Sequence, residues 1–191
     1  MLWRAVAPTW TAVVLAVLAG SALIGLAARV AIPLPFSPVP ITGQTFAVLL
    51  VGAALGARLG AAALTAYLVE GLLGLPVFAG GTSAWAPTRI PGVPVILGPT
   101  AGYLAGFVAA AFVVGWLAER GWDRRPLTTA LAMALGNVAI YLLGLAWLAR
   151  FVGVEGAFPL GAQPFLVGDL LKLLVAAAVL PAAWRLRRPP R

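Results

Sequence analysis

Two ionisable residues interrupt an apolar stretch near the end of the chain, residues 164–180. Asp169 and Lys172 are three positions apart, so on a helix their side chains share one face. The stretch is long and apolar enough to cross a bilayer, where an ionisable pair is costly unless it faces protein or a ligand. The two groups could simply neutralise each other and join two helices. We favour the alternative, a binding site with one carboxylate and one amine.

The composition indicates a membrane protein. Of the 191 residues, 62% are hydrophobic and 9% are charged, against about 45–50% and about 25% in soluble proteins. The apolar segments lack the period-two alternation of a membrane β-barrel, so we predict an all-α integral membrane protein. The net charge of +8 lies in the short segments between apolar stretches, which favours a role in membrane topology and not nucleic-acid binding.

Several kinds of chemistry are missing from the sequence. It has no cysteine and no histidine, which removes thiol nucleophiles, imidazole bases and the usual sulfur and nitrogen metal ligands. It also has no GxxxxGK[ST] phosphate-binding loop, no HExxH motif and no carboxylate cluster with metal spacing. We therefore predict a binding protein and not an enzyme, with no metal site and no cofactor.

Six membrane spans can be drawn, which together form one predicted membrane domain over residues 1–191. The second and third are shorter than the roughly 20 residues that a span requires. If the spans alternate in direction, the long connections rich in proline and glycine all fall on one side of the membrane. The predicted spans are 10–29, 44–57, 59–75, 99–118, 126–148 and 164–184, and the long connections are 31–43, 76–98 and 151–163.

Basic residues set the orientation of these spans. Nine of the thirteen lysines and arginines fall on the side opposite the long connections, and such residues concentrate on the cytoplasmic side of membrane proteins. We therefore expect a multi-pass protein of the cell membrane with both termini in the cytoplasm. The nine residues are Arg4, Arg58, Arg120, Arg124, Arg125, Arg185, Arg187, Arg188 and Arg191.

This orientation places polar residues of different spans at similar depth. Asp169 lies about five residues, or roughly 8 Å, inside the outer end of the sixth span, with Lys172 one turn deeper. Tyr141 in the fifth span and Glu70 in the third lie at comparable depth. Scattered structural residues have no reason to align in this way, so we predict a shared pocket that opens outward. Glu70 is its weakest member, because it could equally cap a neighbouring helix or pair with Arg89.

The first span carries small residues at a spacing of four, namely Ala12, Ala16 and Gly20. Small residues at this spacing let another helix approach closely. In a chain so rich in alanine, the pattern by itself is a weak indication of a partner protein.

Five short segments are distinctive when they are taken together and in order. They are PVPITGQTFAVLL at 38–50, GLPVFAGG at 74–81, GPTAGYL at 98–104, GNVAIYLLG at 136–144 and GDLLK at 168–172. With these segments, the chain resembles the BioY family over about residues 10–180. Members of this family are the biotin-binding S components of energy-coupling factor (ECF) transporters.

The resemblance implies an S-component fold of six helices with structured outer loops, in which the first and third loops close an outward-facing biotin pocket. The family's D-x-x-K pair corresponds to Asp169 and Lys172, and its third-loop arginine corresponds to Arg89. The resemblance also implies a transmembrane T component and two ATPase subunits as partners, which the small residues of the first span would contact. The missing phosphate-binding loop agrees with energy supplied by such partners.

Biotin suits the residues that the sequence singles out. The carboxylate of Asp169 could accept hydrogen bonds from the ureido N–H groups, while Lys172 or Arg89 could pair with the valerate carboxylate or the ureido oxygen. Which cation meets which oxygen stays open. The predicted substrate-binding residues are Asp169, Lys172, Arg89, Tyr141, Trp85, Phe78, Ile41 and Gln44.

We therefore predict a high-affinity biotin-binding subunit of an ECF vitamin transporter, which takes biotin across the bilayer with ATP-hydrolysing partners. One alternative is an S component for another vitamin, such as thiamine or riboflavin. A second is a small intramembrane enzyme, such as a lipid-modifying transferase. The lack of histidine and cysteine disfavours that second alternative.

Overall fold

Helices make up most of the structure, a computed structural model that describes residues 9–186 and the side chains of residues 9–182. The α-helices are α1 (Trp10–Arg29), α2 (Gln44–Leu55), α3 (Ala57–Leu72), α4 (Ala101–Glu119), α5 (Pro126–Gly161) and α6 (Leu166–Leu186). Between them lie the short 3₁₀ helices η2 (Ala79–Gly81), η3 (Val95–Leu97), η4 (Trp122–Arg124) and η5 (Gln163–Phe165). Of the basic residues used to predict the topology, Arg4, Arg187, Arg188 and Arg191 lie outside the described residues, as does the side chain of Arg185.

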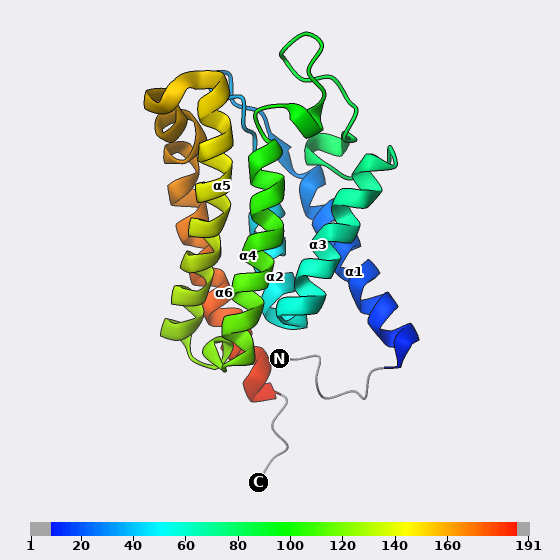
Figure 1. Cartoon of the computed structure of the whole chain (residues 1–191). Helices are drawn as coiled ribbons and strands as arrows, with labels where there is room; N and C mark the ends of the chain where they lie inside the picture. Colours follow the sequence, from blue (N-terminus) through cyan, green and yellow to red (C-terminus); the bar gives the residue numbers. More distant parts are fainter. Residues whose placement is uncertain (1–8, 187–191) are drawn as a thin grey trace.

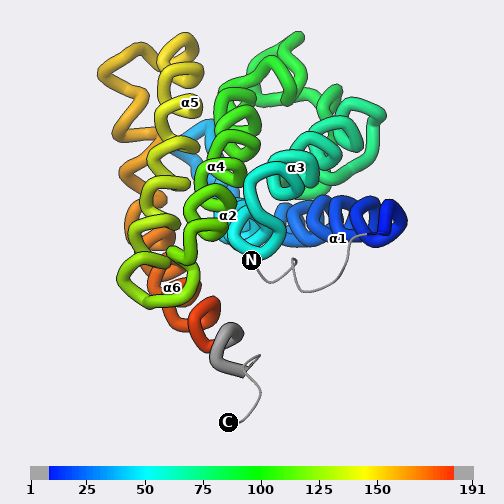
Figure 2. Tube along the Cα trace, turned by 60° about the horizontal axis from the view of Figure 1, so that its bottom comes forward, coloured from blue at the N-terminus to red at the C-terminus, as the bar shows by residue number. Residues whose placement is uncertain are grey.

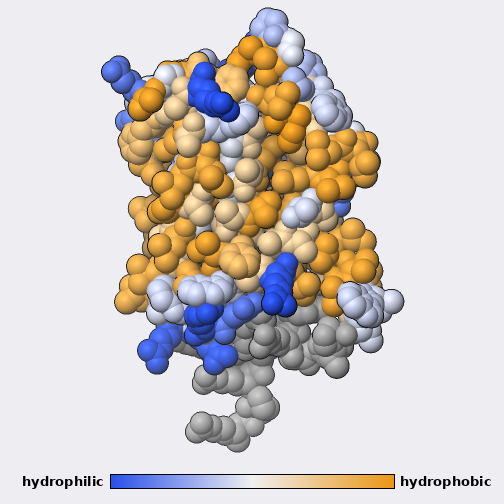
Figure 3. Space-filling model, viewed as in Figure 1, coloured by the Kyte–Doolittle hydropathy of each residue, from blue (hydrophilic) through white to orange (hydrophobic). Residues whose placement is uncertain are grey.

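The apolar helices are those of a membrane protein. Among residues 9–186, three helical stretches are long and apolar enough to cross a membrane: Trp10–Arg29, Ala101–Glu119 and Pro126–Ala182, the last of which includes α5 and most of α6. α2 has 12 residues and α3 has 16, fewer than the roughly 20 that a span requires. In Figure 3, the visible face carries a broad hydrophobic band between hydrophilic groups at both ends. The number of six spans remains a prediction.

α4 lies at the centre of the molecule, where it packs against α2, α3 and α5 (Figures 1 and 2). Glycines on α4 allow α5 to approach closely. A Cβ atom added at Gly106 would lie 2.9 Å from the Cα atom of Ile140, and one added at Gly102 would lie 2.3 Å from the Cβ atom of Trp147. α1 packs against α3 on one flank and α6 packs against α5 on the other.

A tight turn joins α2 to α3 and is held by α4. Gly56 forms the turn with a φ of 86°, a conformation that glycine adopts at little cost. The carboxylate of Glu119, the last residue of α4, accepts a hydrogen bond of 3.0 Å from the backbone N–H of Ala57. Because the first N–H groups of a helix have no partner within it, this acidic side chain stabilises the start of α3.

The connections 31–43 and 76–98 gather at one end of the molecule, the loop end, which is uppermost in Figure 1. In the first, β1 (Ala31–Ile32) pairs antiparallel with β2 (Ile41–Thr42). The second contains η2, η3 and two isolated bridges. The all-α prediction missed the small sheet, because strands of two residues are too short to show alternation.

α5 continues beyond its predicted end at residue 148. It runs to Gly161, with one non-helical residue at Gly153, where φ is 77° and ψ is 163°. The helix changes direction there, and its last part folds over at the loop end (Figure 1). The hydroxyl of Ser37 donates a hydrogen bond of 2.7 Å to the backbone oxygen of Leu160. This bond ties the end of α5 to connection 31–43.

Candidate functional site

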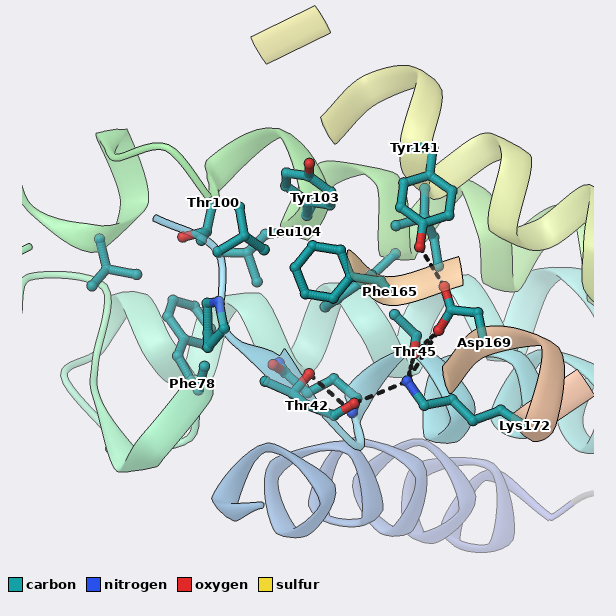
Figure 4. A pocket seen from close by; sticks show the side chains of 17 residues that line it. Thr42, Thr45, Phe78, Thr100, Tyr103, Leu104, Tyr141, Phe165, Asp169 and Lys172 are labelled. Atoms are coloured by element: carbon teal, nitrogen blue, oxygen red, sulfur yellow. Dashed lines mark hydrogen bonds and ion pairs between the residues drawn. The ribbon is translucent and has the colours of Figure 1, made fainter. Parts of the chain in front are cut away.

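A cavity, the inner cavity, lies among α2, α4, α5 and α6 and is bordered by connections 31–43 and 76–98 (Figure 4). It contains about 640 Å³ of empty space, counting the open space at its mouth. Most of its wall is apolar or aromatic, and one part of it is polar. The larger apolar lining residues are Val39, Phe78, Val95, Leu104, Phe107, Ile140 and Phe165.

The polar wall is built around Lys172 and Asp169 on α6. Lys172 Nζ lies 3.0 Å from Asp169 Oδ1, and the two side chains are 24% and 6% exposed. Lys172 also donates to the backbone oxygen of Thr42 at 3.1 Å and to Thr45 Oγ1 at 2.8 Å. Each of the three N–H groups of the ammonium therefore has an acceptor. The two charged residues neutralise each other, as one interpretation of the sequence expected, and both also line the cavity.

Asp169 has one acceptor position left. Its Oδ1 atom accepts from Lys172 and, at 3.4 Å, from the hydroxyl of Thr45. Its Oδ2 atom accepts from the hydroxyl of Tyr141 on α5. A carboxylate oxygen can accept two hydrogen bonds, so Oδ2 can take a second donor. Because Asp169 is 5% exposed, a molecule in the cavity is the natural source of that donor.

Two buried tyrosines support the walls. Tyr103 on α4 lines the cavity, and its hydroxyl donates a 2.8 Å hydrogen bond to the backbone oxygen of Gly161 at the end of α5. Tyr67 on α3 lies behind the wall, where its hydroxyl accepts a 2.6 Å hydrogen bond from the amide of Gln44, which lines the cavity. Both hydroxyls thus fix elements that surround the cavity.

The inner cavity brings together five of the eight residues predicted to bind substrate. Tyr141, Phe78 and Gln44 line it together with the charged pair (Figure 4 labels all but Gln44). Ile41, whose backbone pairs with Ile32 in the small sheet, does not line it. Trp85 does not line it either. Its ring is turned outward, 61% exposed, and its indole N–H donates to the backbone oxygen of Leu72 at 2.8 Å.

Arg89, the third predicted residue outside the inner cavity, lines a second cavity at the loop end. This outer cavity holds about 790 Å³ of empty space, counting the open space at its mouth, and lies between connections 31–43 and 76–98. Arg89 Nη1 donates a 3.0 Å hydrogen bond to the backbone oxygen of Leu34 and so links the two connections. The two cavities adjoin, because they share the lining residues Pro40, Ala79, Val95 and Thr100.

Glu70 is not among the residues that line either cavity. Its carboxylate accepts a 2.5 Å hydrogen bond from the hydroxyl of Ser21. The contact joins α1 to α3, so within the described residues Glu70 has a structural partner on a neighbouring helix. This contact is neither the helix cap nor the pair with Arg89 that the sequence offered as alternatives to a place in the pocket.

Thr42 and Thr45 belong to the polar wall, and sequence reasoning did not select them. The signal available was the polar run 42–45, which stands directly before the apolar segment of α2. That run alone reads as a turn and a helix start. It acquires its role only because α2 packs against α6, which brings both residues to the ammonium group.

The small residues of α1 face two ways. Gly20 is buried, and a Cβ atom added there would lie 3.0 Å from the Cβ atom of Ala63 on α3. Its small size therefore serves packing within this chain and does not leave it open to a partner protein. Ala12 and Ala16 are half-buried.

Curated proteins similar to this chain are described as biotin transporters. The chain is 40% identical over 158 residues to a probable biotin transporter BioY of Pyrococcus horikoshii, which covers 83% of this chain and 87% of that protein. It is 37% identical over 173 residues to the biotin transporter BioY of Rhizobium etli, and the match covers 86% of this chain and 88% of that protein. It is 39% identical over 164 residues to the biotin transporter BioY of Thermotoga maritima, and the match covers 83% of this chain and 88% of that protein.

A solved structure shares the fold of this chain, and a family model matches nearly all of its sequence. The structure is similar to the crystal structure of the S-component for biotin from an ECF-type ABC transporter, with a TM-score of 0.78 at 22% sequence identity. The match covers 94% of this chain and 95% of that one. The model of the BioY family matches residues 4–189. The resemblance found in the five sequence segments is therefore confirmed, and the chain belongs to the BioY family.

Proposed function

We propose that this chain is the biotin-binding S component of an ECF-type transporter and that the inner cavity holds biotin. The observation that carries the proposal is the buried carboxylate of Asp169, which retains one acceptor position at a cavity with aromatic walls. The ureido ring of biotin supplies N–H donors, and its fused rings are apolar. The similar proteins described as biotin transporters support the same ligand.

In the proposed complex, a ureido N–H group donates to Oδ2 of Asp169, and Tyr141 and Lys172 hold that carboxylate in place. The bicycle and its thioether pack against Phe78 and the other apolar walls. Gln44 contributes a further polar group at the same cavity. Ile41 and Trp85 are left out of the proposed site, since they do not line it.

The valerate chain would pass from the inner cavity into the outer one, toward Arg89. Two observations support this assignment. The cavities share four lining residues, so a chain of a few methylene groups could connect them. The ammonium of Lys172 already has three acceptors, whereas a guanidinium has five N–H donors, and the only bond of Arg89 among the described residues joins it to Leu34. Arg89 is therefore the better partner for the carboxylate.

The proposed topology has six spans, with the loop end outside the cell and both chain termini in the cytoplasm. The basic residues at the end opposite the loops support this orientation. α2 and α3 would cross as short helices buried by their neighbours, which local thinning or tilt of the bilayer accommodates. The hydrophobic band in Figure 3 suits such an arrangement.

The proposed partners are a transmembrane T component and two ATPase subunits. The similarity to an ECF-type S component supports them, as does the absence of a phosphate-binding loop from the sequence. Ala12 and Ala16 remain candidates for the contact on α1. Gly20 is not, because α3 covers it. In this role the chain binds and carries a solute, and it is a transport subunit and not an enzyme.

Titration of the purified chain in lipid nanodiscs tests the proposed function. Biotin, thiamine and riboflavin are added separately, and the heat of binding is measured. We expect one biotin per chain and no binding of the other two vitamins. Binding of thiamine or riboflavin in place of biotin would identify an S component for another solute, and binding of none would refute the proposal.

A further inference from the structure

Tyr67 is a buried residue that lines neither cavity and yet touches two residues that line the inner one. It is 0% exposed. Its hydroxyl lies 2.6 Å from Nε2 of Gln44, and its ring centroid lies 5.2 Å from that of Phe78. Gln44 begins α2, whereas Phe78 belongs to connection 76–98. Tyr67 therefore holds two separate parts of the cavity wall from behind.

The bond to Tyr67 occupies one end of the Gln44 amide and leaves the other end to the cavity. Nε2 donates to the tyrosine hydroxyl, while Oε1 takes no hydrogen bond from the described side chains or backbone, although Gln44 lines the cavity. The oxygen is thus the end of the amide that remains for a ligand. The backbone of Gln44 is also fixed, because its N–H donates to Thr42 Oγ1 at 3.3 Å.

We infer that Tyr67 is a positioning residue that sets the ligand preference of the inner cavity. Its hydroxyl holds Nε2 of the Gln44 amide, which leaves the amide oxygen to the cavity as a second acceptor for a ligand N–H beside Asp169. The two ends of an amide have nearly the same size and opposite hydrogen-bonding character. Without the hydroxyl, no hydrogen bond from the described residues holds either end of the amide, and its oxygen is no longer fixed for the ligand. The inference rests on the proposed function, since it supposes a ligand with N–H groups in this cavity.

The test variant is Tyr67→Phe, which removes the hydroxyl and keeps the ring. The ring has to stay, because Phe78 is seated between it and Gly71, where an added Cβ atom would lie 2.2 Å from Phe78 Cζ. The matched control is Thr65→Val on the same helix. Its hydroxyl bonds only to the backbone oxygen of Ala61 on an exposed face, so its loss should change neither binding nor folding.

Biotin and its two mono-N-methyl ureido derivatives are titrated against each variant. We expect Tyr67→Phe to weaken biotin binding about three- to tenfold, the effect of one neutral hydrogen bond. The same substitution should reduce the affinity for the methylated isomer that lacks the N–H group facing Gln44 by a smaller factor. The difference in affinity between biotin and this isomer should therefore be smaller in Tyr67→Phe than in the unmodified chain. A merely structural role would weaken all three ligands by the same factor. That outcome, or unchanged biotin binding, would overturn the inference.

A double-mutant comparison shows whether Tyr67 acts through Gln44. Because the hydroxyl works only on the amide, adding Tyr67→Phe to Gln44→Leu should cause no further loss of biotin affinity. Independent effects, with the two losses multiplying, would contradict the proposed route. Equal melting temperatures of Tyr67→Phe and the unmodified chain would establish that the fold is kept.

A measurement without ligand separates this inference from the proposed function. The side-chain amide of Gln44 is observed by NMR in the unmodified chain and in Tyr67→Phe. We expect one amide proton to be protected from exchange with water only when the tyrosine hydroxyl is present. Identical amide signals in both proteins would overturn the inference about Tyr67. Failure of the unmodified chain to bind biotin would instead overturn the proposed function.

Discussion

Replacing Asp169 by asparagine removes the negative charge of the inner cavity while keeping the size of the side chain. The carboxylate accepts from Lys172 and Thr45 at Oδ1 and from Tyr141 at Oδ2. An amide offers an oxygen at only one of these positions. Its NH₂ group must then face either the ammonium of Lys172, where donors oppose each other, or the hydroxyl of Tyr141, where it takes the place of the acceptor oxygen. The acceptor presented to the ligand is lost or misdirected in either orientation.

The expected loss follows from the hydrogen bonds that change. A hydrogen bond to a charged group contributes about 1.5–3 kcal/mol, which corresponds to a factor of about 10 to 160 in affinity. The Lys172 side chain is 24% exposed, and solvent screening reduces the charged contribution. We therefore predict that Asp169→Asn weakens biotin binding by about 10- to 50-fold, in the lower half of that range.

Isothermal titration of the purified variants measures this loss. Glu70→Gln is the matched control, since Glu70 is also an acidic residue of an apolar helix but bonds to Ser21 and lines neither cavity. Its biotin affinity should stay within about twofold of the unmodified chain. Unchanged biotin affinity of Asp169→Asn, or an equal loss of affinity in both variants, would refute a contact between Asp169 and the ligand.

Three further substitutions test other parts of the site. Arg89→Ala should weaken biotin about two- to fivefold, as expected for an exposed ion pair, and leave biotin methyl ester unaffected in the same titration; equal losses would exclude a contact with the carboxylate. Thr45→Val removes an acceptor from Lys172, so the affinity for biotin should fall about threefold or more, and unchanged titration curves would contradict this. Gly71→Ala places a methyl group 2.2 Å from Phe78 Cζ, so thermal unfolding should show a loss of about 1–3 kcal/mol, and an unaltered melting temperature would speak against the packing described.

The charged pair and the helical character could be predicted because each depends on local sequence. An acid and an amine three positions apart on a helix meet wherever that helix is placed. Apolar segments likewise indicate helices in lipid regardless of their neighbours, since each helix satisfies its own backbone. These features need no knowledge of tertiary contacts.

The rest of the polar wall could not be predicted because it depends on helix packing. Thr45 lies 127 positions before Lys172 in the chain, and they meet only where α2 crosses α6. The outward position of Trp85 depends in the same way on how connection 76–98 folds against the end of α3. No local pattern carries that information.

Composition was misleading where a single residue absorbs a change of direction. Connection 151–163 contains several glycines and a proline, which favour a loop. In the structure Gly153 alone takes the positive φ, and helix continues on both sides of it. The small residues of α1 were ambiguous for a related reason. Small residues allow close packing between helices of one chain and also between helices of two chains. Gly20 allows close packing of α1 on α3 within this chain.

A density map of the purified chain bound to biotin tests the central claim most directly. We predict density for the fused rings in the inner cavity, with a ureido nitrogen within hydrogen-bonding distance of Asp169 Oδ2 and the valerate directed toward Arg89. Biotin bound elsewhere, with Asp169 and Lys172 still bonded only to each other and to their protein neighbours, would contradict it.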